Sequence, residues 1–198
     1  MVTVTKTIGT AVGSAGTGTV DSDGSTTVTG NSTTFNTDFP DGIGTIEIAS
    51  VLYQVVSVAS DTSLTTDVVV PVGSSQSYNV GLRDYSTMVL WEADLDDTNI
   101  YSSDNDAVGH VYNDSEYTQK LEINGGGTVG LNSILLTVPE SERHDGTAGT
   151  GARIVKNEAG APLTLTVSTL PSRIEWLKIK KNGNDGNGLV GNSTTNTE

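Results

Sequence analysis

Short runs in which apolar and polar residues alternate recur along this chain, and they constrain its fold more than any other feature. Examples are residues 44–49 (GTIEIA) and 51–59 (VLYQVVSVA), the second rich in β-branched side chains. Successive side chains of a strand point to opposite faces of a sheet, so a period of two predicts half-buried strands. Turn-forming residues separate the runs at spacings of about 8–12 residues, which is typical of a small barrel or sandwich.

The composition agrees with many short strands joined by tight turns. Charged residues make up 17% and hydrophobic residues 34% of the 198 residues, and Gly occurs 23 times. Thr favours strands, whereas Ser, Asn, Asp and Gly favour turns. This composition excludes a helical bundle, a coiled coil and collagen. The length allows one domain or two small ones at roughly 150 residues per domain. We therefore predict an all-β protein.

Changes in pattern along the chain predict two small β units. Residues 1–14 are predicted to form an N-terminal strand and a linker, with a small, Gly-rich stretch at 11–18. Residues 15–82 are predicted to form a small β-barrel or sandwich domain of about five to seven strands. Residues 83–181 are predicted to form a second β-rich domain, either a sandwich or a short β-solenoid. Residues 182–198 have no core-forming pattern and are predicted to be a tail.

Within the second unit the pattern predicts one short helix followed by strands. The helix is expected near residues 86–95, with Ser86 as N-cap and Met88, Trp91 and Leu95 on one face. Such a stripe is expected to pack against a core. The strands are expected at 107–112, 120–123, 133–138, 152–156, 163–167 and 174–179.

The charge balance narrows the classes of partner. Ten Lys and Arg stand against 24 Asp and Glu, for a net charge of −14. A field of this sign repels phosphate backbones and anionic membrane surfaces, so we expect no nucleic-acid or membrane partner. Cysteine is absent, which excludes disulfides and thiolate chemistry. The N-terminal residues lack the pattern of an export signal, so synthesis in a cytoplasm is expected.

No motif in the chain predicts catalysis, a cofactor or a metal. One metal hypothesis is a calcium site formed by carboxylates of the acidic stretch Asp94, Asp96, Asp97, Asp104 and Asp106. The spacing of an EF-hand is not met, because Asn99 stands where Gly is needed and Asn105 where Glu is needed. Residues 142–145 (ERHD) could be drawn as an acid/base cluster, but a surface charge network is the simpler interpretation. The chain has no Gly-x-Ser-x-Gly elbow, and residues 125–128 (GGGT) lack the Lys of a phosphate-binding loop.

Two segments carry a resemblance. Residues 27–64 resemble a small β-domain common in structural proteins of tailed bacteriophages. The matching positions are Thr27 to Gly30, Phe35, Ile46, Ile48, Tyr53, Val55, Ser57, Val58 and Ser60 to Leu64. Gly44-Thr45 stands where that family has Gly-Asp.

The second segment looks like the opening of a β-rich domain of phage virion proteins that often leads into a right-handed parallel β-helix. Its positions are Arg83 to Thr87, Trp91 to Ala93, Tyr112 to Asp114, Glu142 to Gly146 and Ile174 to Ile179. In those proteins a strand like residues 2–10 is closely followed by the Asp-Tyr-Ser-Thr motif. Here the small β-domain stands between the two, which implies that it is inserted into the second domain.

The resemblance implies a non-enzymatic virion structural protein on the outer surface of a tailed phage, acting as a capsid decoration or cement protein. Expected partners are the major capsid protein or other virion proteins. The alternative is a tail or head fibre, a receptor-binding module that contacts host glycans. Candidate stacking residues for that role are Tyr85, Trp91, Tyr101, Tyr112, Tyr117 and Trp176. A third hypothesis is a polysaccharide hydrolase that uses Glu142 and Asp145.

The chain is also expected to work as an oligomer, as a trimer or on a capsid lattice. Two small β units have thin cores and exposed sheet edges that favour pairing. The uninterrupted apolar runs 68–70 and 134–136 predict strands buried on both faces, for which a partner subunit could supply the second face.

Overall fold

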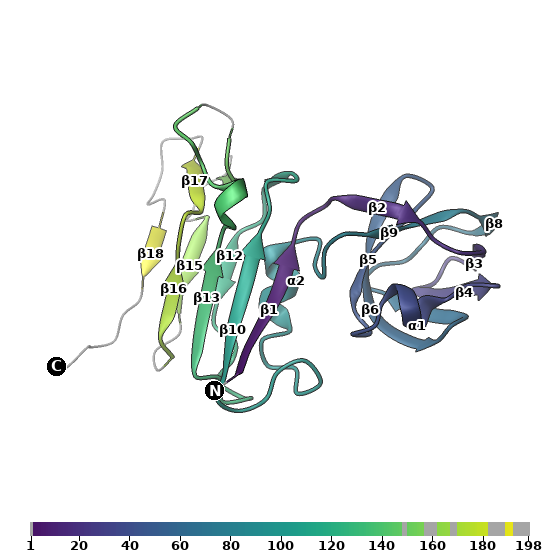
Figure 1. Cartoon of the computed structure of the whole chain (residues 1–198), viewed down its shortest axis with the longest axis horizontal. Helices are drawn as coiled ribbons and strands as arrows, with labels where there is room; N and C mark the ends of the chain where they lie inside the picture. The colour runs from purple at the N-terminus through teal and green to yellow at the C-terminus, as the bar shows by residue number, and fades with distance from the viewer. Residues whose placement is uncertain (1, 148–149, 157–161, 167–169, 182–188, 192–198) are drawn as a thin grey trace. The chain divides into compact units, whose positions relative to one another are not determined.

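The computed structural model describes residues 2–147, 150–156, 162–166, 170–181 and 189–191 (Figure 1). Strands account for 46% and helices for 8% of the structure, so the prediction of an all-β chain with a short helix is confirmed. The chain separates into two compact units. The solenoid unit consists of Met1–Ile8 and Thr87–Glu198, and the inserted unit is Gly9–Ser86. The inserted unit therefore interrupts the solenoid unit in sequence.

Parallel strands build the solenoid unit. Its first sheet has the order β1 (Val2–Ile8), β10 (Asn105–Val111), β13 (Ser133–Thr137) and β16 (Ser172–Ile174), which lie side by side in Figure 1. β1 pairs with β10 along its whole length, from Val2 opposite Asn105 to Ile8 opposite Val111. The N-terminal strand is thereby part of the unit that follows the insertion.

Two further parallel sheets complete the solenoid unit. The second sheet contains β11 (Glu116–Tyr117), β14 (Arg153–Lys156) and β17 (Lys178–Lys181), and the third contains β12 (Leu121–Ile123), β15 (Leu163–Leu165) and β18 (Leu189–Gly191). The chain passes through the first, second and third sheets and then returns to the first. Successive turns therefore stack strand on strand as a parallel β-solenoid. Of the two architectures predicted for this region, the solenoid forms and the sandwich does not.

Alternation of side chains fills the interior of the solenoid. Ala107 and Val111 of β10 are buried, as are Ile134 and Leu136 of β13. Leu135, between the last two, is only half-buried. β13 thus turns one face to the interior and the other outward, and burial of the outward face by a partner subunit stays a prediction.

Helix α2 (Met88–Ala93) packs against β1, β10 and β12. Its N-cap is Thr87, whose Oγ1 accepts a hydrogen bond from the backbone N–H of Leu90 at 3.2 Å, so the predicted cap at Ser86 is wrong by one residue. Trp91 is fully buried beside Gly109 of β10, where an added Cβ would lie 3.0 Å from two atoms of its ring. α2 thus covers apolar residues beside β1, and the predicted apolar stripe faces a core. The 3-10 turn η1 (Glu140–Glu142) lies between β13 and β14.

The inserted unit is one curled antiparallel sheet. Its order is β2 (Val12–Ala15), β9 (Tyr78–Gly81), β5 (Gly44–Ile48), β6 (Val51–Ser60), β7 (Ser63–Thr66), β4 (Thr27–Asn31), β3 (Thr19–Ser22) and β8 (Gly73–Gln76). The helical turn α1 (Phe35–Asp38) supplies Phe35 to the core, with its ring 5.6 Å from that of Tyr78 and 6.4 Å from that of Phe39. A single curled sheet is closer to the predicted barrel than to a sandwich.

The predicted linker belongs to this sheet. Val12–Ala15 forms β2, which pairs with β9. The backbone N–H of Gly16 donates to the carbonyl of Tyr78 at 2.9 Å, and a Cβ on Gly16 would lie 2.0 Å from the Tyr78 ring. Small residues here permit close packing, so they are not evidence of a flexible linker.

Two other boundaries also differ from the prediction. The run 174–179 is divided between β16 and β17, because the chain turns between them at Trp176, whose φ is +61°. Within the predicted tail, β18 pairs with β15, and the other residues of 182–198 lie outside the described residues.

The run 68–70 is not a strand. Val68 and Val69 are 53% and 56% exposed, and Val70 alone of the three is buried.

Candidate binding surface

Most of the aromatic residues proposed for stacking serve the core. Trp91, Tyr101 and Tyr117 are at most 5% exposed, and Tyr85 in the inserted unit is also buried. The indole N–H of Trp91 donates to the hydroxyl of Tyr101 at 3.1 Å. The hydroxyl of Tyr117 lies 3.1 Å from the carbonyl of Ile8, to which it donates. All four side chains are buried, so none of them offers a ring to a ligand.

Two of the candidates remain accessible. Tyr112 is half-buried. Trp176, between β16 and β17, is 59% exposed and has a φ of +61°. The guanidinium carbon of Arg143 lies 4.5 Å from the centre of the Trp176 ring, within the range of a cation–π contact. The Nε of Arg143 donates to the carbonyl of Val138 at 3.0 Å, which fixes the arginine at the end of β13.

Basic residues gather on the strands next to this tryptophan. Residues 143–181 carry seven Lys or Arg against three Asp or Glu, whereas the rest of the chain carries three against 21. In the second sheet Arg153 of β14 lies opposite Lys178 of β17, and Lys180 follows two positions later. Ile154 and Val155 are both buried, whereas Arg153 is half-buried. Lys180 is exposed and Lys178 is half-buried.

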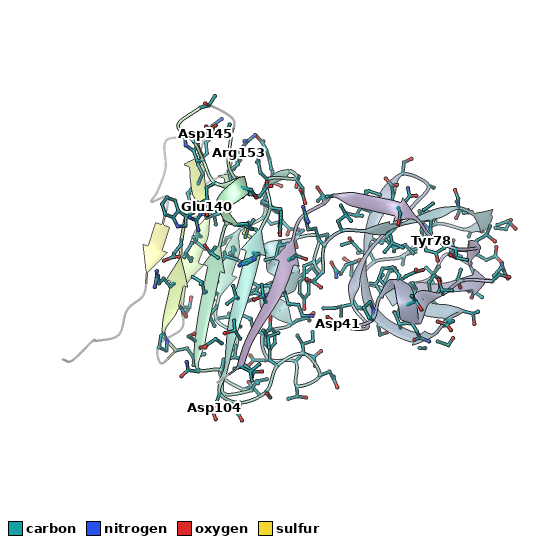
Figure 2. The ribbon with its side chains drawn as sticks, viewed as in Figure 1. Asp41, Tyr78, Asp104, Glu140, Asp145 and Arg153 are labelled. Carbon is teal, nitrogen blue, oxygen red and sulfur yellow. The ribbon has the colours of Figure 1, made fainter. Side chains whose placement is uncertain are left out.

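An ion pair joins this face to the preceding turn. Arg153 donates through Nε and Nη2 to Oε1 of Glu116, at 2.9 and 2.6 Å. Figure 2 shows Arg153 and Asp145 at the same end of the solenoid unit. The sequence pattern did not single out Arg153, Lys178 or Lys180. Their concentration within 143–181, visible as a local reversal of charge, is the signal that could have found them.

The proposed acid/base cluster is divided among local contacts. Glu142 Oε2 accepts from the backbone N–H of Asn113 at 3.3 Å, and His144 Nδ1 accepts from Gly146 N–H at 2.9 Å. Asp145 Oδ1 accepts from Thr147 N–H at 2.8 Å, and such bonds hold the pKa of Asp145 below its ordinary value. The geometry gives Glu142 and Asp145 separate backbone partners, so it does not favour the hydrolase hypothesis.

Three of the five proposed calcium ligands accept hydrogen bonds from other residues of the fold. Asp96 Oδ1 accepts from Thr128 N–H at 2.8 Å, and Asp97 Oδ1 from Asn99 N–H at 2.8 Å. Asp106 Oδ1 accepts from Ser133 Oγ at 2.6 Å, a bond that lowers the pKa of Asp106. Among the residues that the structure describes, no three His, Asp or Glu side chains gather in a way that could hold a metal ion.

Glu92 of helix α2 organises the Gly-rich segment. Its Oε1 accepts from the backbone N–H groups of Asn124 and Gly125, each at 2.9 Å. Asp96, which follows the helix, accepts from Thr128 N–H, so the helix and the turn after it both bind the loop that joins β12 and β13. Of the three glycines that could suggest phosphate binding, Gly125 instead packs against Glu92 and Leu95.

A hollow of about 460 Å³ lies in the inserted unit. Its lining residues are Asp21, Ser22, Asp23, Thr27, Thr29, Val72, Gly73 and Ser74. Asp21 accepts from the N–H of Ser75 at 2.6 Å and from Asn31 Nδ2 at 2.7 Å, which lowers its pKa. These contacts tie β3 to β4 and to β8, so the hollow is an acidic surface whose carboxylate stabilises the sheet.

Comparison with known proteins adds no assignment: no protein-family model, no curated protein and no solved structure matches this chain. Within the part of the chain that the structure describes, no helix has the length and apolar character needed to cross a membrane.

Proposed function

We propose that this chain is a non-catalytic structural protein on the outer surface of a tailed bacteriophage particle, where it decorates or cements the head. The observation that carries the proposal is the solenoid unit, in which parallel strands stack turn on turn beside helix α2. Such a stack is a stiff spacer whose outer faces remain free for contacts. The phage resemblance of the two segments and the net charge of −14 also support an outer position, away from packaged DNA.

The proposed partners are the major capsid protein or other virion proteins, with the chain itself assembled as a trimer. An apolar loop in the inserted unit supports a protein contact. Val68, Val69 and Val72 are 53%, 56% and 78% exposed. The loop is anchored, because Thr66 Oγ1 donates to the Val68 carbonyl at 2.8 Å and Val70 N–H donates to Ser25 at 2.9 Å. An anchored apolar loop loses little conformational freedom when it is covered.

Immunogold labelling of purified particles of the phage that encodes this chain tests the location. Gold on the head is the expected result, and absence of the protein from purified particles would overturn the proposal. Gold confined to the tail would instead favour the second function described below. Light scattering on the isolated chain tests the trimer, and a monomer whose melting temperature does not depend on concentration would exclude it.

A second candidate function is a head or tail fibre module that contacts host glycans. One observation favours it: Trp176 exposes 59% of its surface beside the guanidinium of Arg143. Exposed aromatic rings stack on the apolar faces of sugars while neighbouring polar groups orient the hydroxyls. A glycan array probed with a multivalent, folded sample tests this function, and an array without any bound glycan would exclude it.

A further inference from the structure

We propose that the solenoid unit binds acidic saccharides, sugar chains whose units carry carboxylates, on a surface formed by Arg143, Arg153, Trp176, Lys178 and Lys180. This surface is called the basic face below. The proposal rests on the second candidate function, glycan binding, and specifies the chemical class of the glycan and the residues that hold it.

The first argument is the local reversal of charge. The chain as a whole has a net charge of −14, yet residues 143–181 carry a net charge of +4. Arg153 and Lys178 lie at the same register position on neighbouring strands, and Lys180 is on the same side of β17 as Lys178. Neighbouring strands are about 4.8 Å apart, so these cations form a short row across the turns of the solenoid. Glu116 lies opposite Arg153 and pairs with it, and the two lysines add positive charge beside this pair, which favours an anionic ligand.

The second argument is the backbone at Trp176. A φ of +61° is a left-handed conformation that glycine or asparagine adopts at little cost and a bulky side chain adopts only with strain. Burial of the Trp176 side chain offsets little of this backbone strain, since the side chain is 59% exposed. A strained, exposed tryptophan is therefore better explained by a ligand than by packing, and it stands two residues before Lys178.

Together these features distinguish between classes of ligand. The ring offers an apolar platform for the face of a sugar, and the lysines and arginines offer partners for carboxylates. A neutral glycan would use the ring alone and leave the cations unexplained. A nucleic acid has a denser and longer array of charge, which the 21 acidic residues outside 143–181 would repel.

Glu116 provides a way to increase affinity. Its carboxylate forms an ion pair with the guanidinium of Arg153, with 2.6 Å between Oε1 and Nη2, and its side chain is half-exposed. It therefore competes with a ligand carboxylate for the same guanidinium. Glu116→Gln removes this competitor, and we expect binding about threefold tighter, the size of one exposed charge contact. A mutation that strengthens binding is difficult to attribute to misfolding.

The experiment measures binding of the full chain to oligogalacturonate, with dextran as the neutral probe and oligo-dT as the nucleic-acid probe. We expect oligogalacturonate to bind and its affinity to fall as salt is raised. The double variant Lys178→Gln, Lys180→Gln should bind about tenfold more weakly, and Trp176→Ala at least as weakly. Lys120→Gln is the matched control, because this exposed lysine pairs with Glu122 outside the basic face, and it should leave affinity unchanged.

Trp176→Gly separates binding from stability. Glycine accepts the left-handed backbone, so this variant should fold at least as well as the parent and yet lose binding. Retained binding would overturn the proposal. Binding of dextran alone, dependent on Trp176, would overturn it while leaving the glycan-binding function intact, and no binding to either saccharide would remove both. Equal binding of oligo-dT that is insensitive to Trp176→Ala would show a non-specific polyanion surface. Self-association abolished by the double variant would show that the basic face contacts a second copy, and either result would also overturn the proposal.

Discussion

Replacing Gly109 by alanine is expected to destabilise the solenoid unit through the contact between α2 and β10. The new Cβ would lie 2.9 Å from Leu136 Cδ1 and 3.0 Å from Cε2 and Cζ2 of Trp91. Both neighbours are fully buried, so neither can move into solvent to make room. Overpacking of a close-packed interior typically costs about 1–3 kcal/mol, and we expect the free energy of unfolding to fall by about 2 kcal/mol.

Tryptophan fluorescence during urea denaturation measures this change in the solenoid unit alone. The chain has two tryptophans, Trp91 and Trp176, and both lie in that unit. The signal therefore does not report unfolding of the inserted unit, and the two units need not unfold together.

A matched control and a compensating substitution make the prediction specific. A Cβ on Gly127 would meet nothing within 4 Å, so Gly127→Ala should change the free energy of unfolding by less than about 0.5 kcal/mol. In a Trp91→Phe background the smaller ring leaves space, and Gly109→Ala should cost less than it does alone. Equal effects of the two alanine substitutions, or strict additivity with Trp91→Phe, would refute the packing argument.

Three further predictions concern polar contacts. Glu92→Ala should lower the free energy of unfolding of the solenoid unit by about 2 kcal/mol, because it leaves two backbone N–H groups, one of them on Gly125, without their carboxylate acceptor. Glu92→Gln should retain most of this stability. Equal urea midpoints for the two variants would contradict the prediction. Partial burial lowers the pKa of His110, so protonation favours the unfolded chain, and stability that is complete above about pH 6.5 should decline as the pH falls below it. His110→Thr, which matches the threonines beside it in register, should flatten the pH dependence of the urea midpoint between about pH 5 and 7, and an unchanged slope would rule out this residue as the cause. Tyr78→Phe removes the hydroxyl that donates to Asp38 at 2.7 Å and should destabilise the inserted unit by about 1–2 kcal/mol, seen as faster amide exchange in its core strands; unchanged exchange would count against it.

Local patterns in the sequence determined the class of fold and the position of most strands. The period of two in β10 and β13 predicts strands because it depends only on neighbouring residues. The helix near Trp91 was predicted for the same reason, since its apolar spacing and its hydroxyl cap lie within a few residues of each other. What such patterns report is which side of an element faces a core.

The identity of each strand's partner was decided only by the tertiary structure. A strand with a period of two can pair with its neighbours in a sandwich or in a solenoid, because every sequence offers the same backbone N–H and C=O groups for hydrogen bonding. The pairing of β1 with β10, which are separated in sequence by the inserted unit, is one example, because no residue near Val2 or Asn105 in the sequence specifies it.

The same distinction separates the candidate surface from the core. Six aromatic residues had equal standing as stacking candidates in the sequence, and burial then removed Tyr85, Trp91, Tyr101 and Tyr117. The charge of residues 143–181 was already present in the sequence. Only the stacking of β17 on β14 places Lys178 beside Arg153. These two residues are separated by one full turn of the solenoid, and side-chain periodicity carries no information over so long a stretch of chain.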